Sequence, residues 1–167
     1  HNLSADDIYK IEVGCSREKS LNMSNYRPAN IWQAQYSIPF IIGAALVYGE
    51  LGPKQVAENR LADRAILCQA DKVRLLADPE VEALLPDTFA ARIEIETKQG
   101  RRFGTFVRHP KGDPENPLTE DELRAKFRRL ATQAMETGQV EDLDSCLDRL
   151  EELGSIDELV RKIKCIQ

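Results

Sequence analysis

The apolar run IPFIIGAALVY, residues 38–48, constrains the fold of this chain more than any other segment. A proline is tolerated in a helix only in the first turn, so Pro39 predicts a helix that begins near Ser37, which can cap it, and ends at Gly49. The run is about half of the roughly 20 residues that a bilayer span needs. It therefore predicts a helix buried in a protein core and no membrane helix.

Strands are predicted where apolar and polar residues alternate. The segments are IYKIEVG at 8–14, KVRLLAD at 72–78, ARIEIET at 91–97 and FGTFVRH at 103–109. The last two flank a turn with Gly100 and form a hairpin. Short helices are predicted within residues 50–71, with Pro53 and Asp63 near their starts, and within 78–87. The pattern predicts an α+β fold, a small antiparallel sheet with packed helices.

The composition changes after His109, where PKGDPENP at 110–117 predicts an irregular loop. A capping box of Thr119 and Glu122 then opens the first of three amphipathic helices, which Gly138 follows. Gly154 stops the second helix, whose acidic run EDLDSCLDRLEE we interpret as a solvated face. The apolar stripes are Leu123, Phe127, Leu130 and Ala134, then Val140, Leu143, Leu147 and Leu150, then Leu159, Ile163 and Ile166. We expect an α+β domain at 1–117 and terminal helices at 118–167 that need a partner surface.

Charge and cysteine content narrow the class of protein. A formal net charge of −5 argues against a nucleic-acid binder or a membrane-surface binder, because both need a concentrated basic face. The four cysteines are scattered without a CxxC pair, which is typical of reduced thiols in a cytosol. The first residues, HNLSADDIYK, lack the apolar region of a signal peptide. We predict a cytoplasmic protein.

Motifs for common cofactors are missing from the sequence. Its two histidines have no second metal-type ligand at helical spacing, and there is no GxGxxG, GxxxxGK[ST] or GxSxG motif. A zinc site of the HExxH kind is therefore excluded, and nucleotide binding and α/β-hydrolase chemistry have no sequence support. His109, at a strand end beside the Pro-rich loop, is compatible with a general acid or base, but also with an ordinary loop hydrogen bond.

Polar side chains precede the apolar run and pose the main functional question. Gln33, Gln35, Tyr36 and Ser37 lie at the predicted helix N-terminus, where backbone N–H groups and the helix dipole favour an anion, and Arg27 is near them in the sequence. One interpretation is a carboxylate-binding corner. The other is structural: Ser37 caps a core helix and the amides bond the loop backbone. Trp32 and Phe40 are expected in the core.

Five blocks of the sequence, in order, resemble the C-terminal portion of the 2-methylcitrate dehydratase family, also called the MmgE/PrpD family. They are HNLSADDIYKIEV, RPANIWQAQYSIPFIIGAALVYGELG, NRLADRAILCQADKVRLLADPEVEALLP, ARIEIETKQGRRF and HPKGDPENPLTEDELRAKFRRLA. AQYSIPF and HPKGDPENPLTEDELRAKF are the most specific of these, and the similarity covers almost the whole chain.

The resemblance implies an enzyme lineage that acts on small di- and tricarboxylates without a cofactor, by dehydration, decarboxylation or epimerisation. A general base takes a proton next to a carboxylate, while cationic and polar groups hold the carboxylates. Family members are commonly homodimers with a helical domain and a smaller α+β domain around a cleft. The matching blocks imply substrate contacts from Arg27, Gln35, Tyr36 and Ser37, and a proton-handling role for Tyr26.

The helical domain, which in this family supplies most of the acid and base residues, has no counterpart here. We expect the chain alone to be inactive and to need that helical region, in the same polypeptide or in a separate subunit. A lyase of propionate metabolism, a dehydratase acting on a polycarboxylate, is the first hypothesis. A non-catalytic dimerisation or regulatory module is the second, because fold alone does not fix activity. Fragment, split subunit and stand-alone module remain open.

Overall fold

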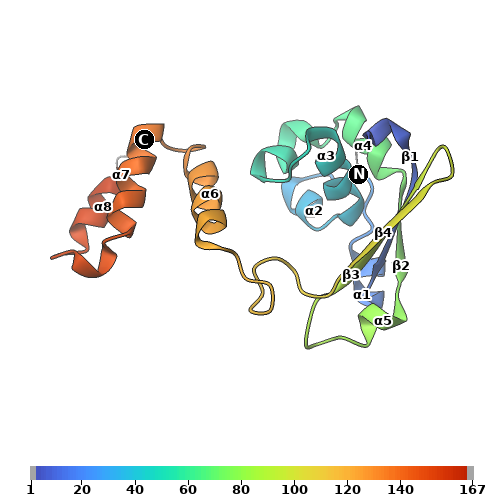
Figure 1. Cartoon of the computed structure of the whole chain (residues 1–167). Helices are drawn as coiled ribbons and strands as arrows, with labels where there is room; N and C mark the ends of the chain where they lie inside the picture. The colour runs from blue at the N-terminus through green and yellow to red at the C-terminus, as the bar shows by residue number, and fades with distance from the viewer. Residues whose placement is uncertain (1–2, 165–167) are drawn as a thin grey trace. The chain divides into compact units, whose positions relative to one another are not determined.

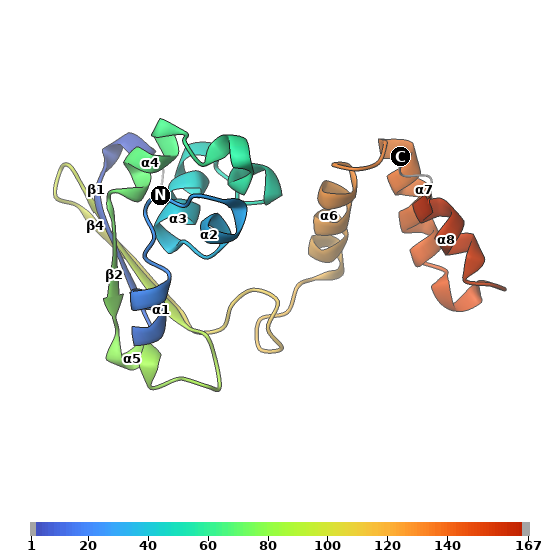
Figure 2. The same ribbon diagram turned by 180° about the vertical axis from the view of Figure 1, so that it is seen from behind.

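The computed structural model describes the backbone of residues 3–164 and the side chains of residues 3–163 (Figures 1 and 2). The chain divides into two compact units, residues 1–110 and 111–167, called here the first and the second unit. The sequence places the boundary at 117, and residues 111–117 belong to the irregular Pro-rich loop.

The first unit contains a four-stranded sheet with the strand order β2-β1-β3-β4. The strands are β1 (Ile8–Cys15), β2 (Val73–Ala77), β3 (Ala91–Thr97) and β4 (Arg102–Val107). The predicted hairpin is confirmed, since β3 and β4 are antiparallel neighbours, and β1 pairs antiparallel with β3. The sheet is nevertheless mixed, because β2 lies parallel to β1. A parallel pair needs a long crossover, which the helices between β1 and β2 provide.

Helix α3 (Ile38–Tyr48) is the predicted core helix, and it is buried on two sides. Ile38, Ile42 and Leu46 pack against the apolar cluster of the sheet. Phe40 and Ala44, both fully buried, belong to a second cluster with residues of the neighbouring helices. A helix between two apolar surfaces needs no polar face, which explains why this run is apolar nearly all round.

Both ends of α3 follow the sequence signals. Ser37 is the N-cap and its Oγ accepts a hydrogen bond from the Phe40 N–H, while Gly49 ends the helix with a φ of 71°. Inside the helix, Gly43 allows α4 (Arg64–Ala70) to approach closely, because a Cβ at this position would lie 2.5 Å from the carbonyl oxygen of Ile66. The local signals therefore give the helix its bounds, and one glycine sets its packing distance.

The remaining helices of the first unit are short. They are α1 (Arg17–Asn22), α2 (Ile31–Gln35) and α5 (Pro79–Glu82), with 3₁₀ turns at Ala5–Asp7, Pro53–Val56 and Glu58–Arg60. Helices α2, α3 and α4 lie on one face of the sheet in both views, and no helix described in the first unit covers the other face (Figures 1 and 2). Trp32, expected in the core, is 74% exposed on α2, so that expectation is wrong, whereas Phe40 is confirmed there.

The second unit contains α6 (Glu120–Ala131), α7 (Thr137–Leu147) and α8 (Asp157–Lys164), with a 3₁₀ turn at Leu150–Glu152. The capping box of Thr119 and Glu122 is confirmed. Gly138 was expected just after the end of α6, but it lies in the first turn of α7. Glu136 and Gln139 form a further capping box that starts this helix. Ile166 lies outside the described residues.

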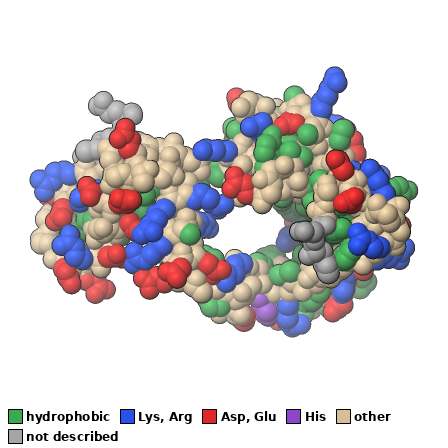
Figure 3. All heavy atoms as spheres, turned by 45° about the horizontal axis from the view of Figure 1, so that its top comes forward, with side chains coloured by type: hydrophobic (Ala, Val, Ile, Leu, Met, Phe, Trp, Pro, Cys, Tyr) green, Lys and Arg blue, Asp and Glu red, His purple; other side chains and the backbone are tan. Residues whose placement is uncertain are grey.

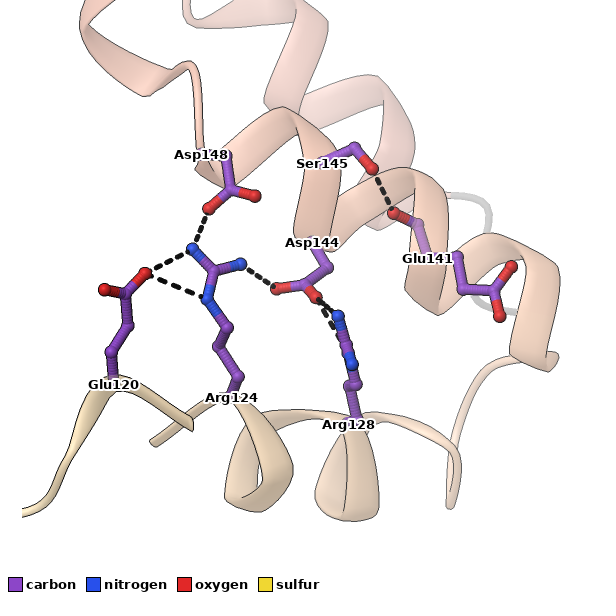
Figure 4. Close-up of polar contacts among 7 residues, drawn as sticks. All are labelled: Glu120, Arg124, Arg128, Glu141, Asp144, Ser145 and Asp148. Atoms are coloured by element: carbon purple, nitrogen blue, oxygen red, sulfur yellow. Dashed lines mark hydrogen bonds and ion pairs between the residues drawn. The ribbon is translucent and has the colours of Figure 1, made fainter. Parts of the chain in front are cut away.

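Ion pairs join α6 to α7 (Figure 4). Asp144, only 6% exposed, accepts from Arg128 through Nη2 at 2.6 Å and Nε at 2.8 Å, and it pairs with Arg124 at 3.4 Å. Arg124 also pairs with Glu120 and Asp148. The acidic run of α7 is therefore not simply a solvated face, because its central carboxylate is buried against two arginines.

Charged side chains of both signs are interspersed over the face of the second unit that Figure 3 shows. Cys15, Cys68 and Cys146 are unbridged thiols. No helix within residues 3–164 has both the length and the apolar character needed to cross a bilayer.

Candidate functional site

The predicted contact residues come from the connecting segment, residues 23–37, which links α1 to α3 and includes α2. Its ends are held together, since the Ile38 N–H donates to the Met23 carbonyl at 3.0 Å. Ser37 is fully buried, and its hydroxyl donates to the Asn25 carbonyl while it accepts from Phe40. The substrate contact predicted for Ser37 stays a prediction, and in this structure the hydroxyl is a structural cap.

The N-terminus of α3 offers few donors to an external anion. The N–H of Ile38 bonds Met23, Pro39 has no N–H, and the N–H of Phe40 bonds Ser37 Oγ. The next N–H, from Ile41, donates to the carbonyl of Ser37 within the helix. The first turn is thus satisfied inside the chain. A carboxylate-binding corner would have to rely on side chains.

Amide side chains of the connecting segment bond its own backbone. Gln33 Oε1 accepts from the Ala29 N–H at 2.8 Å and from Asn25 Nδ2 at 3.2 Å. Asn30 caps α2 by accepting from the Gln33 N–H at 2.9 Å. The structural interpretation of the amides therefore holds for Gln33. Gln35 differs, because it lies exposed at the end of α2.

Arg27 is the cation of the connecting segment. Its Nη2 donates to Asp71 Oδ2 at 2.8 Å and its Nη1 to the Tyr26 carbonyl at 2.9 Å, while its backbone N–H donates to Asn25 Oδ1. About half of each side chain in the ion pair is exposed. The hydrogen bond raises the pKa of Arg27 and lowers the pKa of Asp71. Arg27 is thus a fixed, charged and accessible group.

Tyr26, the predicted proton-handling residue, is half-buried. Its hydroxyl donates to the Val73 carbonyl at 2.8 Å. Tyr26 and Arg27 therefore attach the connecting segment at two successive points to the junction of α4 and β2. The catalytic role stays a prediction, and it would require this hydrogen bond to open.

The outward side of α2 carries two large aromatic side chains. Trp32 is 74% exposed and Tyr36, at the C-cap of α2, is 64% exposed. Residues four apart lie on the same side of a helix. The structure thus leaves Arg27, Gln35 and Tyr36 accessible among the five predicted residues, while Tyr26 and Ser37 are turned to internal partners.

Sequence reasoning missed Asp71 and the exposure of Trp32. Asp71 follows Arg27 by 44 residues, and nothing local marks it as a partner. A signal that could have indicated the exposure of Trp32 is its spacing of four from Tyr36 on a short helix with a polar cap. His109, the other residue considered for catalysis, is half-buried, and its Nδ1 lies 3.4 Å from Thr88 Oγ1.

Two hollows lie on the uncovered face of the sheet, with volumes of about 260 and 220 Å³. Both are lined by Glu12 and Glu94, which are directly opposite each other on β1 and β3. Like charges in this position destabilise a sheet pair. None of the predicted contact residues lines either hollow.

Comparison with known proteins gives a consistent result. The sequence profile of the MmgE/PrpD C-terminal domain matches residues 1–152. The cis-aconitate decarboxylase-like protein oryM of Aspergillus oryzae is 30% identical to this chain over 139 residues. Cis-aconitate decarboxylase of Mus musculus is 26% identical over 141 residues. Each alignment covers 82% of this chain and 28% of the relative, so the chain spans less than a third of either protein.

Proposed function

The chain belongs to the MmgE/PrpD family and matches its C-terminal domain, and from this premise we propose that it forms the substrate-contacting part of a lyase that acts on small di- or tricarboxylates. The observation that carries the proposal is Arg27, an exposed guanidinium held in a fixed position in the same connecting segment as the exposed Gln35 and Tyr36. Both relatives have names that specify a tricarboxylate, cis-aconitate.

In this proposal Arg27 binds a carboxylate of the substrate. Guanidinium groups suit this task because they are always charged and present several donors in one plane. Gln35 and Tyr36, exposed in the same segment, add neutral donors. Ser37 and Tyr26 hold the connecting segment in place through Asn25 and Val73, and Tyr26 moves a proton only in a conformation that releases Val73.

In a dehydration, a general base abstracts a proton next to a carboxylate, and the hydroxyl on the neighbouring carbon leaves as water after taking a proton from a general acid. In a decarboxylation, the bond to the leaving carboxylate breaks to release carbon dioxide, and the electron pair left on carbon takes up a proton. Both steps proceed without a metal or organic cofactor in this proposal. The names of the two relatives favour decarboxylation over the dehydration that the family name implies. We propose that the general base comes from a helical partner region, in the same polypeptide or in a separate subunit of a homodimeric enzyme.

The second unit supports the need for a partner. Helix α6 has no buried residue, and Leu123 and Ile156 are 57% and 59% exposed. Apolar stripes on amphipathic helices are normally covered in the functional protein. The competing hypothesis, a non-catalytic dimerisation or regulatory module, accounts for the same stripes without a substrate.

The first experiment is isothermal titration calorimetry of the purified chain with citrate and with cis-aconitate. We expect weak binding that is lost in Arg27→Ala. The matched control is Arg102→Ala, because Arg102 is an exposed arginine with its own carboxylate partner, Glu96, on the sheet. Equal effects of the two substitutions would argue against a specific carboxylate site.

The second experiment adds the helical portion of a family member and assays turnover of 2-methylcitrate and cis-aconitate. Turnover that needs both polypeptides and Arg27 supports the lyase. Assembly without turnover on any polycarboxylate, and with no effect of Arg27→Ala, supports the non-catalytic module instead.

A further inference from the structure

Asp71 holds Arg27 from a separate part of the fold. It is the C-cap of α4 and lies two residues before β2, so its backbone is in the short turn that joins this helix to the sheet. Arg27, by contrast, lies in the irregular part of the connecting segment. The 2.8 Å ion pair therefore ties a loop cation to the junction of α4 and β2.

Two bonds in different directions fix the plane of the Arg27 guanidinium. Nη2 donates to Asp71 and Nη1 donates to the Tyr26 carbonyl, while the hydroxyl of Tyr26 itself is fixed on Val73. A guanidinium has five N–H donors. Within the part of the chain that the structure describes, these two bonds use two of them and leave three for a ligand.

We propose that Asp71 is a positioning residue, which orients the Arg27 guanidinium so that its remaining donors meet a carboxylate of the substrate. This role rests on the proposed function of Arg27 as the carboxylate contact. Asp71 itself does not touch the substrate in this arrangement.

Two observations favour a positioning role for Asp71 over competition with the substrate and over a role in stability. Asp71 engages Arg27 through a single Nη2 contact, so a substrate carboxylate binds the other donors without displacing it. The pair is about half exposed, and exposed ion pairs add little to stability. Its geometry therefore matters more for the direction of the side chain than for the folding of the domain.

The test compares wild type with Asp71→Asn and, as a matched control, Glu96→Gln, which removes the carboxylate of the ion pair between Arg102 and Glu96. The first readout is nuclear magnetic resonance of the Arg27 guanidinium, which needs no ligand. We expect separate Nη signals in wild type and in Glu96→Gln, because rotation is restricted, and averaged signals in Asp71→Asn.

The second readout is the affinity for citrate and cis-aconitate. We expect Asp71→Asn to bind both about tenfold more weakly, the scale of one charge-assisted hydrogen bond. Glu96→Gln should bind as wild type does, and both variants should keep the wild-type melting temperature within a few degrees. Asp71→Glu should recover part of the affinity.

Three results would overturn the inference. Unchanged affinity in Asp71→Asn, with affinity lost in Arg27→Ala, leaves the proposed function intact and rejects the positioning role. Tighter binding in Asp71→Asn means that Asp71 competes with the substrate for Arg27. If wild type binds neither anion although the Nη signals still depend on Asp71, the ion pair is real but the proposed function fails, and the role toward a substrate fails with it.

Discussion

The two units hold their helices by different interactions. In the first unit, α3 is packed on both sides by apolar side chains, with Phe40 and Ala44 completely buried. In the second unit, α6 has no buried residue and is joined to α7 largely through arginine and aspartate side chains. Apolar burial is independent of pH, whereas ion pairs depend on both pH and salt. The first unit therefore has an extensive core of its own. In the second unit α7 buries Val140, Leu143 and Cys146, but Leu123 and Leu150 remain exposed.

The largest effect on stability is expected for Phe40→Ala. It removes a fully buried aromatic side chain from between α3 and its neighbours, and such truncations cost about 3–5 kcal/mol. Urea unfolding followed by circular dichroism measures the loss. Trp32→Ala is the control, because this side chain is mostly exposed, and it should change stability by no more than about 0.5 kcal/mol. Equal losses in the two variants would contradict the buried and exposed positions described above.

A smaller and local effect is expected for Asp144→Ala. The substitution leaves Arg124 and Arg128 without their shared buried acceptor and should destabilise the second unit by about 1–3 kcal/mol. Hydrogen exchange followed by mass spectrometry should show faster exchange in α6 and α7 and unchanged exchange in α3. Asp142→Ala, on the exposed side of α7, should leave both units unchanged. Faster exchange in α3 would mean that the two units do not unfold separately.

Acid should weaken the second unit before the first. The hydrogen bond from Arg124 lowers the pKa of Asp148 in the folded state below its unfolded value of about 3.9. A carboxyl with a depressed folded pKa stabilises the protein above the unfolded pKa, and this stabilisation is lost as the pH falls through the folded pKa. The first unit also contains carboxyls with lowered pKa values, at Asp63, Asp71 and Asp78, but its apolar core does not titrate. Hydrogen exchange, corrected for the intrinsic rate, is measured between pH 5 and pH 3. As the pH falls, α6 and α7 should lose protection from exchange before α3 does; loss of protection in α3 at the same pH would contradict this.

The sequence predicts those features that local signals determine. Ser37, Pro39 and Gly49 place α3 correctly, since cap, proline and glycine each act within one turn. The parallel pairing of β2 was not predicted, because pairing between strands separated by four helices has no local signal. The same holds for Asp71 as the partner of Arg27.

The spacing of charged residues could have predicted the ion pairs between α6 and α7. Arg124 and Arg128 are four apart on one amphipathic helix, and Asp144 and Asp148 are four apart on the next. Residues with this spacing lie on one side of each helix, so the two sides can pair. Which side of α7 faces α6 still depends on tertiary packing, and the same acidic residues would read as a solvated face on an isolated helix.

The smallest effect on the isolated chain, and the sharpest test of the comparison, is expected for Leu123→Ser on α6. Leu123 is 57% exposed, so its removal should change the stability of the chain by no more than about 0.5 kcal/mol. If the apolar stripe of α6 is instead buried against the helical region of a family enzyme, the same substitution should weaken that association roughly ten- to a hundredfold, because one buried leucine contributes about 1.5–3 kcal/mol. Analytical ultracentrifugation of the chain mixed with that helical region measures the change, with Lys126→Ser on the same helix as the control. Equal association of the two variants would show that the helical region does not cover α6. The exposed apolar side chains of the second unit would then have to be covered by a different partner.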